Sequence, residues 1–493
     1  MKRILRNISL LSCAAVLACS CESVDFGDTN DNPNGPGAAV TSQLLTEAEK
    51  TVSTIGTHLS GVLFTQQITE GQYPGESRYT VLTYNYNDYY TGPIQNLNEI
   101  IKLNTNEATK GEAEAYGNND NQIAVAKILR SYILQFMTDR WGGLPWTEAF
   151  QGIDNPQPKF DTQEELYNIM FTEVEEAMAM INMEAPGPQG DVMFGGDMSR
   201  WELFANSLKM TMALRISDAN PSLAKSKFEE VIASGKYIDS NDENIEFMYG
   251  SDDASDSPWH DRFKTREDYI VSETMIESLR SNLDPRLYQY AMPARDSVFQ
   301  NPVFPALTDA AKYPALNDSL YVGAPDGKVN GNVPDYSFPP AVIIYEDNTF
   351  PTPIYTAAQM KLSLAEAALN NWTVGGADAL TLFKEGITAS MEYWGVDAED
   401  IANYVDGYTA VTIEDIAYEK WVALYLNGPE AWAEWRRLDA PALTPSEFAG
   451  DQRIPVRHAY DASVESNNKA NYDEIVSKQG PDNLHTKLWW DVN

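Results

Sequence analysis

The chain has 493 residues, of which 43% are hydrophobic and 22% are charged, a balance typical of a globular protein. Its charge is strongly acidic, because 72 Asp and Glu against 35 Lys and Arg give a net charge of −37. Such a surface repels phosphate backbones, so the composition argues against a nucleic-acid partner. The length allows a sizeable core, in one helical array or in about two to four domains.

The first 21 residues are typical of a bacterial lipoprotein signal. Basic residues at positions 2, 3 and 6 precede an apolar run that is too short for a normal membrane span. All three cysteines of the chain lie here, and VLAC and ACSC, which end at Cys19 and Cys21, both resemble a lipobox. We expect residues 1–20 to be removed and Cys21 to carry acyl chains such as palmitate, with Cys19 as the alternative. A plain secretory signal with incidental cysteines is the other interpretation.

The next segment predicts a tether. Residues 25–37 (DFGDTNDNPNGPG) are rich in turn formers and cannot make a long helix or strand. Their acidic and amide side chains match only part of a calcium loop, so we expect no metal there. We therefore predict a tether over residues 21–40 and a single globular domain over residues 41–493.

Helical periodicity dominates the domain. Leu166, Met170 and Val174 recur at helical spacing, and Thr162 with Glu165 forms a capping box in front of them. The same pattern predicts helices within residues 201–212, 222–234, 360–371, 377–394 and 413–438. These helix–turn–helix pairs of about 35–40 residues indicate a mainly α fold built from tetratricopeptide-like units.

Two stretches lack this periodicity. Residues 236–352 are dominated by Pro, Asp, Asn, Gly and Tyr, and residues 72–92 carry six tyrosines. Long irregular connections are costly to order, so they often carry function. We expect the first stretch to be an irregular, loop-rich insertion and both to face the ligand.

Several motifs together resemble the SusD/RagB family of surface nutrient-binding lipoproteins, in particular its SusD-like branch. They occur in the family's order and are, in this chain, DRWGGLPWTEA (139–149), PKFDTQEELY (158–167), FANSLKMTMALRI (204–216), DPR (284–286), EAWAEWRR (430–437), RIP (453–455) and DNLHTKLWWD (482–491). The family's YGD[IV]PY segment is WGGLPW here, a small departure that leaves the resemblance intact.

This resemblance implies a helical SusD-like fold with four tetratricopeptide-like pairs. It also implies a lipid-anchored position at the cell surface, in the outer membrane, and a SusC-like TonB-dependent barrel as partner. The ligand would be an oligosaccharide or, as in some members, a peptide. No cofactor and no catalytic residue is expected.

The residues themselves point to binding more than to catalysis. The sequence has four histidines, none of them paired at metal-ligand spacing, and no metalloprotease, serine hydrolase or phosphate-loop motif. We expect exposed aromatic rings to stack on sugar, with Trp259 first, flanked by Asp256 and His260 as hydrogen-bonding groups. Tyr79, Tyr84 and Tyr86 offer the same chemistry. For each of these residues, packing in the core or solvation in a loop is the competing interpretation.

We therefore predict a non-catalytic lipoprotein that binds a nutrient, most simply an oligosaccharide, for uptake. The alternatives are a glycan-degrading surface enzyme and a tetratricopeptide-type adaptor that binds protein only. With 72 acids in the chain, a glycosidase carboxylate pair cannot be recognised from sequence, since such pairs are defined by separation in space. The sequence does not identify the ligand.

Overall fold

The computed structural model describes residues 39–294, 320–329 and 335–493. The described helices and strands belong to one compact unit, Thr41–Asn493. The expected signal peptide, Cys19, Cys21 and nearly all of the expected tether lie outside the described residues.

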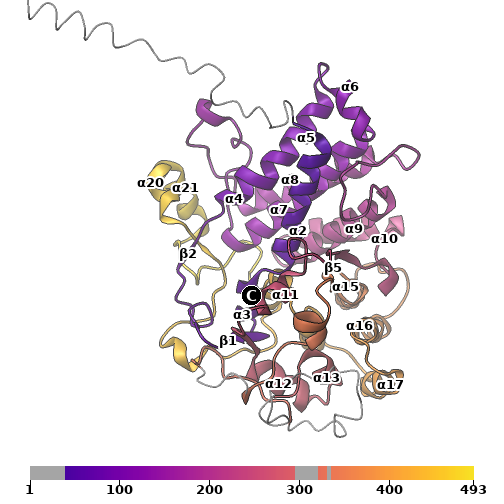
Figure 1. Ribbon diagram of the computed structural model, residues 1–493, viewed down its shortest axis with the longest axis vertical. Coiled ribbons are helices and arrows are strands. Elements are labelled where there is room, and N and C mark those ends of the chain that lie inside the picture. Colours follow the sequence, from indigo (N-terminus) through magenta and orange to yellow (C-terminus); the bar gives the residue numbers. More distant parts are fainter. Residues whose placement is uncertain (1–38, 295–319, 330–334) are drawn as a thin grey trace, which may run out of the picture. The chain divides into compact units, whose positions relative to one another are not determined.

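The described part of the chain is mainly helical, as predicted (Figure 1). Its α-helices are α2 (Thr41–Gly56), α3 (Leu59–Phe64), α4 (Asn87–Tyr89), α5 (Gln95–Thr105), α6 (Lys110–Ala113), α7 (Asn119–Trp141), α8 (Gln163–Met180), α9 (Met198–Arg215), α10 (Pro221–Ser234), α11 (Pro258–Phe263), α12 (Glu273–Ser281), α13 (Leu287–Tyr290), α15 (Ala357–Leu369), α16 (Ala379–Tyr393), α17 (Ala398–Asp406), α18 (Ile413–Ala423), α19 (Gly428–Leu438), α20 (Ala462–Asn467) and α21 (Lys469–Gln479).

Among the described helices, the consecutive pairs that pack most extensively are α7 with α8, α9 with α10, α15 with α16 and α18 with α19. Figure 1 shows α9, α10, α15, α16 and α17 following one another down one side, with α20 and α21 on the opposite side. This arrangement confirms the predicted fold class, a mainly α protein of tetratricopeptide-like helix pairs.

The predicted helix ends are where local signals placed them. Thr162 and Glu165 form the capping box of α8, and Gly235, with a φ of 65°, follows α10 as its C-cap. Helix α7 ends at Trp141 because Gly142, at a φ of 84°, adopts a backbone conformation that residues with a side chain rarely take.

Strands are short and pair in twos. β1 (Ile68–Glu70) is antiparallel to β4 (Tyr269–Val271), and β3 (Ile245–Phe247) is antiparallel to β5 (Thr352–Tyr355). β2 (Thr83–Tyr84) runs parallel to β6 (Ala459–Tyr460). The last pair joins the tyrosine-rich stretch to the C-terminal part of the chain.

The stretch expected to be irregular carries short regular elements where it is described, among them α11, α12, β4 and the π-helical turn η8 (Val342–Glu346). They enclose a second hydrophobic cluster, which includes Phe263, Ile276 and Leu279. The larger cluster lies among α2, α5, α7, α8, α9, α15 and α16. The same cluster also includes Val62 and Leu63 from α3 and Trp421 and Val422 from α18, so the insertion packs onto the helical scaffold.

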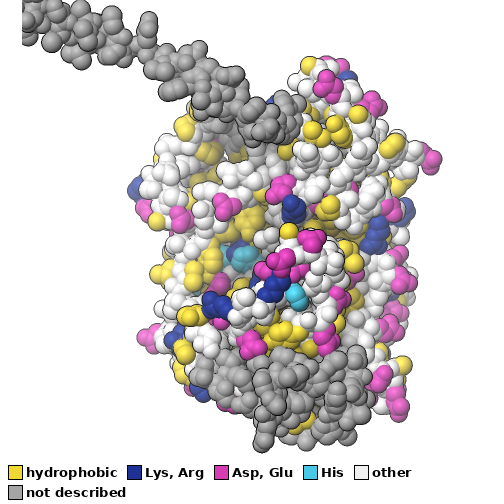
Figure 2. Space-filling view, viewed as in Figure 1, with side chains coloured by type: hydrophobic (Ala, Val, Ile, Leu, Met, Phe, Trp, Pro, Cys, Tyr) yellow, Lys and Arg dark blue, Asp and Glu magenta, His cyan; other side chains and the backbone are white. Residues whose placement is uncertain are grey.

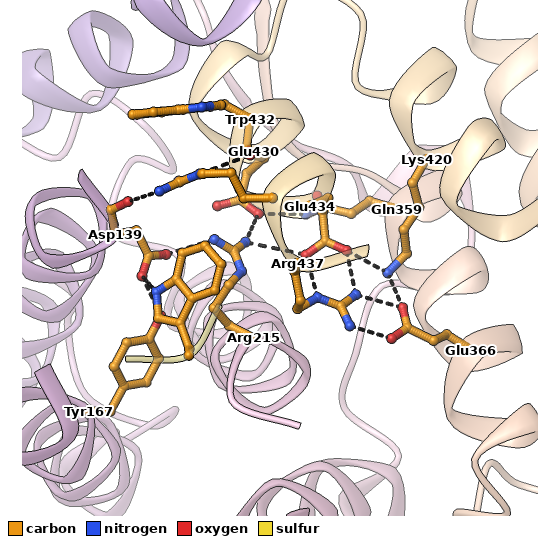
Figure 3. Close-up of polar contacts among 12 residues, drawn as sticks. Asp139, Tyr167, Arg215, Gln359, Glu366, Lys420, Glu430, Trp432, Glu434 and Arg437 are labelled. Atoms are coloured by element: carbon orange, nitrogen blue, oxygen red, sulfur yellow. Dashed lines mark hydrogen bonds and ion pairs between the residues drawn. The ribbon is translucent and has the colours of Figure 1, made fainter. Parts of the chain in front are cut away.

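Buried charges connect the helix pairs (Figure 3). Arg437 on α19 binds Glu366 on α15 at 2.5 and 2.7 Å and Glu434 at 2.6 Å, and Lys420 on α18 binds the same two carboxylates. Arg215 on α9 joins Asp139 to Glu430. We call these residues, together with Arg436, the ionic network. It contains four acids and four bases, and each of them is at most 15% exposed.

The C-terminal motif completes this network. Trp490 is fully buried, and its indole N–H donates to Asp139 at 2.9 Å, while Tyr167 donates to the same carboxylate at 2.5 Å. Arg436 lies over the rings of Trp432 and Trp490. The C-terminal motif DNLHTKLWWD therefore stabilises the fold, because Trp490 supplies a hydrogen bond that the buried carboxylate of Asp139 needs.

Candidate functional site

The tyrosine-rich stretch leads into a distorted helix. Strand β2 is followed by α4, by the π-helical turn η2 (Tyr90–Ile94) and directly by α5. Pro93 lies inside this turn, and because proline has no N–H it cannot make the regular helical hydrogen bond. Such π-turns inside helices are frequent at functional sites.

This distorted helix forms one wall of a pocket of about 460 Å³. The second wall is the loop that follows the DRWGGLPW motif, and the third is the junction of α20 and α21. The lining residues are Tyr86, Asn87, Tyr90, Thr91, Gln95, Pro145, Ala149, Phe150, Asn155, Pro156, Pro158, Phe160, Ser463, Val464, Asn467 and Asn468. We call this hollow the aromatic pocket.

Four aromatic rings line the pocket. Tyr86 and Phe160 are buried, while Phe150 is 42% exposed. The ring of Tyr90 lies 5.6 Å from that of Phe150 and 5.7 Å from that of Tyr86, and its hydroxyl donates to the carbonyl of Pro145 at 2.5 Å. The hydroxyl is thus held away, which leaves ring faces to contact a ligand.

Phe150 has an unusual backbone. Its φ is 64°, in the left-handed region that costs a residue with a side chain about 1–2 kcal/mol. Its ring is held by Trp146, 5.9 Å away, as well as by Tyr90. A strained residue that presents a half-exposed ring at the edge of a pocket is typical of a binding site.

Amide and hydroxyl groups supply the polar part of the lining. Several of them are fixed by the backbone: Asn468 donates to the carbonyl of Pro158 at 2.7 Å, and Gln157 donates to the carbonyl of Asn467 at 2.7 Å. These bonds fasten α20 and α21 to the 146–160 loop, although the two segments are about 310 residues apart in sequence. The pocket is therefore largely preformed.

The structure places the predicted site residues in different surroundings. Tyr86 lines the aromatic pocket. Tyr84 is half-buried outside it, stacks on His458 at 3.6 Å and donates to Glu76 at 3.0 Å. Tyr79 is 1% exposed and packs against Phe64. The predicted residues thus do not form one site.

Trp259 differs from its prediction in exposure. We expected an exposed ring, and this is wrong: the side chain is 4% exposed, belongs to the second hydrophobic cluster and is covered by Arg262 at 4.6 Å. The residues 258–263 form α11, whose helical spacing turns Trp259 and Phe263 together into the core.

His260 lies on α11 and Asp256 lies just before that helix, and their side chains bind each other. The carboxylate of Asp256 lies 3.1 Å from Nδ1 of His260 and 2.7 Å from Nζ of Lys264. Nδ1 of His260 and Oδ2 of Asp256 are therefore already partnered, and whether either residue contacts a ligand stays a prediction.

Sequence reasoning missed most of the pocket. Phe150, Asn467 and Asn468 stand in no motif that suggests sugar binding, and of the two irregular stretches expected to face the ligand only residues 72–92 contribute to the lining. In the part of the chain that the structure describes, no helix is long and apolar enough to cross a membrane. No cluster of three or more metal-ligating side chains occurs within the same described ranges.

Comparison with known proteins gives the family. Residues 33–461 match the model of a SusD-like family described as starch-binding and associating with the outer membrane. The chain belongs to this SusD-like family. No curated protein matches it.

Solved structures agree. A chitin-binding protein is 26% identical with a TM-score of 0.74, and the match covers 92% of this chain and 100% of that one. A SusD homologue from Bacteroides fragilis (21% identity, TM-score 0.76, 92% and 100% covered) and a chitin-binding SusD homologue from Flavobacterium johnsoniae (20%, 0.70, 92% and 99%) share the fold. The SusD-like chain therefore has the fold of nutrient-binding proteins of the outer membrane.

Proposed function

We propose that this SusD-like protein captures an oligosaccharide in the aromatic pocket and delivers it to a SusC-like TonB-dependent barrel for uptake. The pocket carries the proposal: a preformed hollow of about 460 Å³ combines ring faces with fixed amide and hydroxyl groups. Sugars present apolar C–H faces and a ring of hydroxyls, which such a surface complements. Two proteins of similar structure are described as chitin-binding, which supports a glycan over a peptide.

The first test is calorimetry with oligomers of N-acetylglucosamine and of glucose. We expect at least one to bind, and Phe150→Ala to weaken binding about 5- to 150-fold, since truncating a central anchor costs about 1–3 kcal/mol. Phe448→Ala is the matched control, because Phe448 is 37% exposed and lies outside the pocket. Equal effects of the two variants would move the site elsewhere, and Tyr84, Asp256 and His260 would be tested next.

We propose binding without catalysis. The pocket lining contains no acid, histidine, cysteine or lysine that could act as a general acid, a general base or a nucleophile. Analysis of the oligosaccharide after long incubation with the pure protein should show intact ligand. Shortened products that are no longer formed when a carboxylate near the bound sugar is replaced would favour the surface enzyme.

We further propose that the protein is held at the cell surface by acyl chains on Cys21, with Cys19 as the alternative. The support is the lipobox-like sequence and the family's association with the outer membrane. Intact-mass analysis of the mature protein tests this. A Cys21→Ala variant that keeps its lipid would assign it to Cys19, and a double variant that keeps membrane association would refute lipidation.

The barrel partner follows from the need for a path through the membrane. A globular helical protein concentrates ligand but cannot conduct it, since an opening must satisfy every backbone polar group within the bilayer. Affinity purification after mild detergent extraction should recover a TonB-dependent barrel. Consistent recovery of the lipoprotein alone would favour the adaptor or the enzyme.

A further inference from the structure

We infer that the aromatic pocket takes an uncharged stretch of glycan and discriminates against sugars that carry carboxylate or sulfate groups. The inference rests on the proposed function and names the substrate class of that site. It starts from what the lining lacks: none of its side chains is Asp, Glu, Lys, Arg or His, although 22% of the chain is charged. The polar groups that face the pocket come from Asn87, Thr91, Gln95, Asn155, Ser463 and Asn467.

An anionic sugar would find no counter-ion there. Removing a carboxylate from water is costly unless a positive group or several hydrogen-bond donors replace the water. Two basic residues beside the lining already bind acids of this chain: Arg457 binds Asp482 at 3.1 Å, and Lys469 binds Glu465 and Asp473. Lys159, next to Pro158, is the remaining basic neighbour in sequence.

Acids surround the pocket instead. Glu148 accepts a hydrogen bond from the side chain of Asn155 at 3.3 Å, and Asp161 accepts from the backbone N–H of Trp146 at 2.9 Å. Burial, followed by the neighbouring Tyr460, Asp482 and Asp461, raises the pKa of Tyr86. The fixed charges that act on the lining are therefore mainly negative.

The acidic surface extends this field. Figure 2 shows acidic side chains spread over the visible face rather than gathered in one patch. A polyanion would be repelled by like charge as it approaches and inside the pocket. A neutral glycan would only exchange the hydrogen bonds between its hydroxyls and water for hydrogen bonds to the amides. The lining also offers no carboxylate for an ammonium group, so a free amino sugar should not be preferred to its N-acetyl form.

The experiment compares chain-length-matched tetramers of N-acetylglucosamine, glucose, glucosamine and galacturonic acid by calorimetry at about 50 mM salt. We expect a neutral tetramer to bind best and the galacturonate at least about 10-fold more weakly, with the gap narrowing at 0.5 M salt because screening removes repulsion. Galacturonate binding as tightly as the best neutral sugar would overturn the inference while leaving sugar capture intact, and so would glucosamine binding that stays as tight at 0.5 M salt, where attraction to the surrounding acids is screened. Absence of binding to all four would overturn the proposed function together with it.

A pair of variants tests the cause. Gln95 is exposed at the pocket wall and begins α5, so Gln95→Lys adds the missing cation and Gln95→Glu adds another acid. We expect Gln95→Lys to raise the ratio of galacturonate affinity to neutral affinity about 2- to 5-fold and Gln95→Glu to lower it. Gln43→Lys, in the first turn of α2 and outside the pocket, is the matched control and should leave the ratio unchanged. An equal change in Gln43→Lys would assign the effect to overall charge and overturn the role given to the pocket.

Discussion

The ionic network and the aromatic pocket handle charge in opposite ways. In the network, four acids are buried among the paired helices and bind three of the bases at 2.5–3.4 Å, while Arg436 donates to the backbone carbonyl of Asp139 at 2.6 Å. In the pocket, charged side chains are excluded and aromatic faces remain accessible. The polar groups of the first region hold helices together, whereas those of the second line a hollow, where some of them also bind the surrounding loops.

The pKa values express this difference. Burial pushes the pKa of Glu434 upward, but Arg437, Lys420 and Arg215 together hold it well below its usual value. At the pocket, burial and neighbouring groups including Asp161 raise the pKa of Tyr90. In the network, positive charge keeps the pKa values of Glu434 and Glu366 low, although burial outweighs it at Asp139 and Glu430, whose pKa values are raised. The pocket lining offers an acid no positive side chain at all.

The largest effect should follow from breaking the network. Arg437→Met leaves Glu366 and Glu434 with fewer counter-charges, and removing one partner of a buried pair typically costs about 3–5 kcal/mol. Urea unfolding measures this loss in the free energy of unfolding. Lys50→Met, which breaks the exposed pair with Glu47, should cost less than about 1 kcal/mol. Similar losses in both variants would show that burial of the network does not matter.

Trp259 tests whether an aromatic ring belongs to the core or to a binding surface. Because its side chain is 4% exposed, Trp259→Ala should cost about 3 kcal/mol in the free energy of unfolding. Phe150→Ala, at a half-exposed ring, should cost less than about 1 kcal/mol but weaken glycan binding. A stable Trp259→Ala protein with reduced affinity would restore Trp259 as a ligand contact.

Local signals made much of the fold predictable. The capping box at Thr162 and the glycines at 142 and 235 act within one helical turn, so their effects can be derived from neighbouring residues. The same helical periodicity accounts for the burial of Trp421 and Trp432, which lie within the helical run 413–438 and are each 1% exposed.

The pocket could not be predicted in the same way. It forms only when β2 pairs with β6, which brings Tyr86 near residues 463–468 from the other end of the chain. The error at Trp259 has a related cause, because a six-residue helix decides which way the ring points and Pro, Asp and Ser around it suggested a loop. The pocket and the orientation of Trp259 therefore both depend on how the folded segments pack, which the local composition does not show.

Asp326 is an exception to the pairing of buried acids. Its carboxylate oxygens are buried, and no Lys or Arg among the described residues pairs with it; burial, with Glu70 nearby, raises its pKa to about 7. The raised pKa means that the charged form is penalised, increasingly as pH rises from about 4 to 7. Asp326→Asn should therefore stabilise the protein by about 1–3 kcal/mol at pH 8 and lose this advantage toward pH 4. An advantage that is independent of pH would contradict the assigned cause.

The smallest expected effect concerns His458, which lies between the two regions and stacks on Tyr84. Its imidazole accepts from Arg140 at 3.2 Å, and burial followed by the charge of Arg140 holds its pKa well below the usual value. The unfolded chain binds a proton near pH 6.5 that the folded chain excludes, so stability is complete above that pH and falls as pH decreases below it. Between pH 7 and 5.5 the free energy of unfolding of the wild type should fall by about 1 kcal/mol more than that of His458→Gln, measured by urea unfolding at each pH.

His58, whose pKa is lowered in the same way, should add a second contribution, so the double variant should show the shallowest dependence of stability on pH. Identical slopes in all the proteins would mean that both histidines bind protons equally in the folded and the unfolded chain, which would contradict the effect assigned to burial and Arg140.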